Sequence, residues 1–142
     1  MAELTVLLPE AGRQLLLAAG AGDRAEFGRR YGRLLDDPDF ERVTVALIGL
    51  LTLLIADWLP DGCDPATAVR VLHERLADLH PRCTALIGVN LVVLEHLARS
   101  VLDLSELLAG LTGAEVSLYA GLIVGTAVPE PARLDELVGR LA

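Results

Sequence analysis

The feature that most constrains this chain is an uncharged stretch, residues 43–56, in which only two threonines interrupt glycine and apolar side chains. Wound as an α-helix, this stretch is apolar all round, so none of its faces is suited to water. Fourteen residues fall short of the eighteen or so needed to span a membrane, so membrane insertion is not expected. The pattern therefore predicts a central apolar helix at about 38–59, enclosed by other helices.

Helix start and stop signals divide the remaining sequence into further helical segments. Asp23 followed by Glu26 forms the pattern of a capping box, and proline and glycine occur at the expected helix boundaries. Alternating strands bounded by turn dipeptides are not found. We therefore predict an all-α fold, a compact bundle of six to seven helices forming a single domain over 1–142. The expected segments are about 9–20, 23–37, 38–59, 65–80, 83–102, 105–111 and 114–126, with a last turn at 131–141.

The composition limits the partners of such a bundle. Hydrophobic residues make up 53% of the chain and the mean hydropathy is +0.49, which leaves more apolar surface than one small core requires. An oligomer interface or a ligand cavity would use this surplus. The net charge of -8 would repel the phosphates of nucleic acids and of anionic membranes, so neither is an expected partner.

The cysteines and the N-terminus favour a cytoplasmic location. Cys63 and Cys83 flank the helix predicted from Pro65 to His80, which would separate them by roughly 24 Å, too far for a disulfide. The first residues lack the basic and apolar segments of a secretory signal. We therefore expect two free thiols in a reducing compartment.

Motifs of enzymes and cofactor sites fail when their context is examined. Residues 20–25, GAGDRA, match the letters of a dinucleotide fingerprint, but no βαβ unit surrounds them. Neither HExxH nor the Glu-x-x-His pair of di-iron bundles is found, and no GxSxG elbow supplies a nucleophile. We therefore predict no catalytic residue, no metal and no cofactor, and favour a protein that is not an enzyme.

Asn90 is the most informative polar residue, because it falls on the apolar face of the helix predicted at 83–102. A buried amide without a partner costs about 1–3 kcal/mol, so Asn90 should bond the backbone, a threonine, a symmetry mate or a ligand. A small-molecule or enzymatic site between helices near Asn90 is therefore an alternative function. The candidate ligand or interface residues are Asn90, Trp58, Asp57, His73, His80, His96 and Arg99.

The helix predicted at 23–37 is the basic element of the chain. Its arginines surround Phe27 and Tyr31, so this face could bind another protein, although the acidic residues that follow could equally neutralise it in solvent. The candidate partner-binding residues are Arg24, Arg29, Arg30 and Arg33.

Two helices carry stripes of small residues that would permit close helix approach. One stripe comprises Ala46, Gly49, Thr52 and Ala56, and the other Ser117, Gly121 and Gly125. Each stripe favours a tight crossing within one subunit, with a helix-on-helix dimer as the alternative. The expected function is accordingly a non-enzymatic interaction module that binds itself as a homodimer, or another protein. A HEAT-like helical repeat that docks onto a larger partner is a further alternative.

Overall fold

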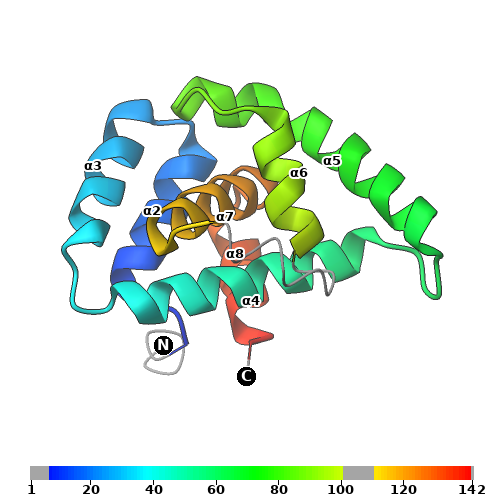
Figure 1. Ribbon diagram of the computed structural model, residues 1–142. Coiled ribbons are helices and arrows are strands. Elements are labelled where there is room, and N and C mark those ends of the chain that lie inside the picture. The colour runs from blue at the N-terminus through cyan, green and yellow to red at the C-terminus, as the bar shows by residue number, and fades with distance from the viewer. Residues whose placement is uncertain (1–6, 101–110, 142) are drawn as a thin grey trace.

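The computed structural model describes residues 7–100 and 111–141, and all regular structure in these ranges is α-helical. The helices pack into a compact bundle, which confirms the all-α prediction (Figure 1). The short helix predicted at 105–111 falls almost wholly outside the described residues. The described helices are α2 (Glu10–Ala21), α3 (Arg24–Leu35), α4 (Phe40–Trp58), α5 (Pro65–Leu86), α6 (Leu91–Ser100), α7 (Gly113–Ala127) and α8 (Pro131–Gly139).

The most enclosed helix of the bundle is α7. It packs against α2, α4, α5 and α6, and every residue from Ala120 to Thr126 is buried (Figure 1). The sequence correctly predicted a long apolar helix at α4, but its enclosure on every side is wrong. Val45 is 69% exposed, and Thr52 and Ala56 are also exposed. The all-round apolar pattern occurs in both helices, so it could not indicate which of them occupies the centre.

Close contact between α2 and α7 depends on two glycines of α7. A Cβ atom at Gly125 would lie 2.4 Å from the Cβ of Ala19 and 3.0 Å from the carbonyl oxygen of Leu16. A Cβ at Gly121 would lie 3.0 Å from Leu15 Cδ2. The missing side chains let the two backbones approach, so this stripe of small residues forms a crossing within the chain, as its favoured interpretation predicted.

Side-chain caps mark the starts of α3, α5 and α7. Asp23 begins α3 by accepting a hydrogen bond from the Glu26 amide at 3.1 Å, as predicted. The Glu26 carboxylate does not complete the capping box, because it accepts hydrogen bonds from Arg29 and Arg30 instead. At the other end of the chain, Thr112 and Glu115 do form a complete capping box at the start of α7.

The main error in the predicted boundaries lies at Pro81. We expected this proline to end its helix, yet α5 continues through it to Leu86. Pro81 removes the hydrogen bond to the carbonyl of Ala77, and because Ala77 and Pro81 are exposed, water can satisfy that carbonyl. The helix predicted at 83–102 instead begins at Leu91, as α6. Cys83 belongs to α5, where it is buried. Both cysteines are free, as predicted.

Candidate functional site

The candidate site is the solvent-facing side of α4. Between Arg42 and Asp57 this helix has no charged side chain, and Val45 is its most exposed large hydrophobic residue. The hydroxyl of Thr52 donates to the carbonyl of Ile48 at 2.8 Å, so its donor is already satisfied. The resulting surface is weakly polar and about 20 Å long. We call it the α4 outer face, and it comprises Val45, Ile48, Gly49, Thr52, Leu53 and Ala56.

An open groove of about 520 Å³ runs beside the α4 outer face. Gly49 makes room for one of its walls, because a Cβ at this position would lie 2.9 Å from Leu141 Cδ2. The groove thus joins the first half of α4 to the two ends of the described chain. Its lining residues are Leu7, Glu41, Arg42, Val45, Ala46, Gly49 and Leu141.

The two predicted stripes of small residues have different environments. The stripe of α7 is buried against α2. In α4, Ala46 is only 6% exposed and faces the core, whereas Thr52 and Ala56 face solvent and Gly49 is half-buried beside Leu141. Within the described part of the chain, most of the α4 stripe is therefore not used for a helix crossing.

Asn90 is not in the core, and this prediction was wrong. It lies in the turn before α6 and is exposed, where its Oδ1 accepts a hydrogen bond from the Val92 amide at 2.8 Å. The backbone carbonyl of Asn90 accepts from the Val93 amide at 3.0 Å. The sequence predicts one continuous helix at about 83–102, but the chain breaks between Leu86 and Leu91, so the helical periodicity assigns Asn90 to the wrong face. The proposed ligand site near this residue therefore loses the buried amide on which it was based.

The three histidines belong to the corner formed by α5 and α6. His73 Nδ1 on α5 contacts the carboxylate of Glu95 on α6. His80 Nε2 lies 2.7 Å from the carbonyl oxygen of Val89, in the turn between the helices. His96 is half-buried and Arg99 is exposed. The contacts of His73 and His80 hold α5 and α6 together at this corner. Within the ranges that the structure describes, no group of histidine, cysteine and acidic residues could hold a metal ion.

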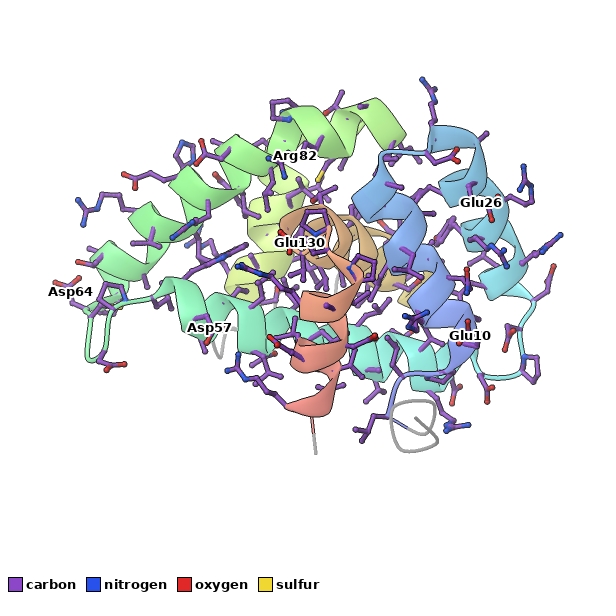
Figure 2. All side chains as sticks on the ribbon, turned by 180° about the vertical axis from the view of Figure 1, so that it is seen from behind. Glu10, Glu26, Asp57, Asp64, Arg82 and Glu130 are labelled. Atoms are coloured by element: carbon purple, nitrogen blue, oxygen red, sulfur yellow. The ribbon has the colours of Figure 1, made fainter. Side chains whose placement is uncertain are left out.

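Asp57 and Trp58 lie where α4 ends. The Asp57 carboxylate accepts two hydrogen bonds from Arg140, at 2.7 and 3.1 Å, and these bonds lower the pKa of Asp57. Figure 2 shows Asp57 on the side of α4 next to α8. Trp58 is half-buried and lines a hollow of about 210 Å³ between α4, α5 and α7. The hydrogen bonds between Asp57 and Arg140 thus link the end of α4 to the residue that follows α8.

The basic residues of α3 differ in their surroundings. Arg29 and Arg30 both contact the carboxylate of Glu26. Arg24 and Arg33 are exposed and form no ion pair with another described residue. The aromatic residues expected among them face inward: Phe27 is 2% exposed, and Tyr31 donates its hydroxyl hydrogen to the carbonyl of Ala114 at 2.7 Å. Burial raises the pKa of Tyr31.

Sequence reasoning missed the exposure of two valines, Val45 on α4 and Val92 on α6. Their exposed fractions are 69% and 66%, the largest among the exposed large hydrophobic residues of the described ranges. Each lies in an apolar run, but charged or polar residues occur one helical turn away, Glu41 and Arg42 for Val45, and Glu95 and His96 for Val92. This spacing was the sequence signal that could have identified the two exposed positions.

The chain matches no protein-family model, no curated protein and no solved structure. Within the described ranges, no single helix is both long enough and apolar enough to cross a membrane. Helices α5 and α6 meet these criteria only when taken together, and they are bent by 119° at their junction.

Proposed function

We propose that this chain is a non-enzymatic interaction module that forms a homodimer through the α4 outer face. The observation that carries the proposal is Val45, 69% exposed on an uncharged helix face in a chain of net charge -8. Removing apolar surface from water is favourable by about 25 cal/mol per Å² of buried area. A second copy supplies a matching surface that has no charged side chain to desolvate.

The same face can pair with itself around a twofold axis. With the axis near the middle of the face, the two copies of α4 run antiparallel, and Val45 of each copy lies opposite Ala56 of the other. The small side chains of Thr52 and Ala56 then allow the helices to approach closely, whereas Gly49 already lies beside Leu141 of its own chain. The fourteen uncharged residues give this seam a length of about 20 Å in each copy.

The size of this surface predicts a weak dimer. The face is about 20 Å long and about 10 Å wide, whereas a stable interface buries about 800 Å² on each partner. The groove beside Val45 must therefore be covered as well, which adds the apolar side chains of Leu7 and Leu141 to the interface and brings the charged side chains of Glu41 and Arg42 to its rim. We expect association in the micromolar range, at the weak end for specific interfaces.

Sedimentation equilibrium of two charge variants tests the proposal. Val45→Glu places a carboxylate at each end of the proposed seam, against the apolar side chain of Ala56, and should leave a monomer at all concentrations up to about 200 μM. Val92→Glu is the matched control, because Val92 is almost equally exposed but lies on α6. The wild type and the control should dimerise alike. A wild type that stays monomeric, or a control that dissociates as Val45→Glu does, contradicts the proposed interface.

A further inference from the structure

The end of α8 crosses α4 between two hollows. The groove of about 520 Å³ beside the α4 outer face borders residues 41–49 of α4 and includes Leu141. A second hollow, of about 640 Å³, borders Leu54 and Asp57 of α4 and includes Leu137 and Arg140. Figure 2 shows α8 passing beside the end of α4 that Asp57 marks. The last residues of the described chain therefore have open space on two sides, and their position depends on the contacts that they make with α4.

Two neighbouring residues make these contacts. The guanidinium of Arg140 donates to both carboxylate oxygens of Asp57, at 2.7 and 3.1 Å. Leu141 lies against Gly49, where an added Cβ would be 2.9 Å from Leu141 Cδ2. Asp57 and Gly49 are eight residues apart, about 12 Å along the axis of α4. Contacts at two separated points fix the direction in which the segment crosses α4, as well as its distance from the helix.

The core anchors α8 only as far as Val138. This side chain is 2% exposed, whereas Gly139 and Arg140 are exposed. A Cβ added at Gly139 would meet nothing within 4 Å among the described residues, and glycine has more backbone freedom than any other residue. The amides of Arg140 and Leu141 donate to carbonyls three residues earlier, at 3.0 Å, in the 3₁₀ pattern of a helix end that frays. Side-chain contacts must therefore hold these two residues, and the ion pair with Asp57 is the polar one.

We infer that the ion pair between Asp57 and Arg140 positions Leu141 for dimerisation. The inference rests on the proposed homodimer, in which the second copy covers the groove and Leu141 supplies one of its apolar walls. When the pair is broken, the last turn frays and Leu141 leaves Gly49. The groove then loses that wall, and the α4 outer face alone is smaller than a stable interface needs. Asp57 and Arg140 are thus positioning residues, because they act on the interface through Leu141.

The strength of the ion pair suits this role. Its two side chains are 49% and 50% exposed, and an exposed ion pair shifts an equilibrium by up to about fivefold. Such a shift is too small to unfold the bundle, but it is large enough to change how often one terminal turn is docked. A twofold dimer contains the groove twice, so the effect on the dissociation constant is up to about 25-fold.

Sedimentation equilibrium of a charge reversal tests the inference. Arg140→Glu replaces the ion pair by two like charges and should raise the dissociation constant of the dimer by about tenfold. Arg133→Glu is the matched control, because Arg133 is also exposed on α8 and pairs with Glu130, at 3.6 Å, but does not line the groove. The control changes the net charge equally and should dimerise nearly as the wild type does. Equal weakening in both variants would show a general charge effect and would overturn the inference.

Reversing both partners tests whether the ion pair itself is responsible. Asp57→Arg combined with Arg140→Glu restores an ion pair of opposite orientation and keeps the net charge of the wild type. Dimerisation should therefore return to within about threefold of the wild type. If this double variant dissociates as readily as Arg140→Glu alone, the pair does not act on the interface and the inference is overturned.

An NMR measurement within the monomer keeps this inference separate from the dimer. In the monomeric Val45→Glu background, a nuclear Overhauser effect should join the methyl protons of Leu141 to the α protons of Gly49. Adding Arg140→Glu should abolish this signal, and its persistence would overturn the inference. Loss of the signal, together with a wild type that stays monomeric, would contradict the proposed homodimer but support the positioning of Leu141.

Discussion

Adding one methyl group to a glycine should have opposite effects at Gly125 and at Gly28. Both glycines lie within helices, where alanine is favoured over glycine by about 1 kcal/mol. At Gly28 the new Cβ meets nothing within 4 Å, so this preference should appear almost in full. At Gly125 the new Cβ would lie 2.4 Å from the Cβ of Ala19, whereas two carbon atoms pack at about 3.5–4.0 Å. Helices α2 and α7 would then have to move apart by more than 1 Å.

The size of the effect at Gly125 follows from the atoms that are contacted. The Ala19 Cβ and the Leu16 carbonyl oxygen are fixed to the backbone of α2, so no side-chain rotation relieves the clash. Overpacking costs about 1–3 kcal/mol, and this rigid contact should lie at the upper end. Subtracting the helix preference of about 1 kcal/mol leaves an expected net loss of about 2 kcal/mol. At Gly121 the contact is Leu15 Cδ2 at 3.0 Å, the end of a flexible side chain, so the loss should be smaller.

Urea unfolding followed by circular dichroism measures this series directly. The free energy of unfolding should rise for Gly28→Ala, fall slightly for Gly121→Ala and fall most for Gly125→Ala, with an unchanged m-value. In a chain of this length, a loss of about 2 kcal/mol lowers the melting temperature by roughly 6–12 °C. If Gly125→Ala were as stable as the wild type, α2 and α7 would not cross at this glycine, and the described core would be wrong.

Two further predictions follow from titratable groups. The hydrogen bonds from Arg140 lower the pKa of Asp57 in the folded chain, so their stabilisation is present above the pKa of unfolded Asp57 and is lost as pH falls through the lower, folded value. Asp57→Asn should therefore reduce the loss of stability between about pH 5 and pH 2, measured by urea unfolding, and an unchanged pH profile would show that the pair contributes nothing. Burial raises the pKa of the Cys83 thiol, whereas Cys63 is only partly buried. A thiol reagent should therefore modify Cys63 first in the native protein and Cys83 only on unfolding, and rapid reaction of both would contradict the burial of Cys83.

The sequence by itself determined most helices and their local boundaries. Asp23, Gly22 and Asp64 act on amides or carbonyls only a few residues away, so their effect could be predicted without the tertiary fold. Pro81 and Asn90 show the limit of such signals. An exposed proline continued its helix, and a turn between α5 and α6 moved the asparagine from the expected core to a cap.

Only the tertiary structure decided which surfaces remain for partners. The apolar runs of α4 and α7 both lack charged side chains, so the sequence alone did not show how much of each helix the rest of the chain would cover. Packing of α2 against Gly121 and Gly125 placed α7 in the centre, and this left Val45 and Thr52 of α4 facing solvent. Similar stripes of small residues therefore became a core crossing in one helix and a candidate interface in the other, because burial depends on the neighbours that the chain brings to each helix.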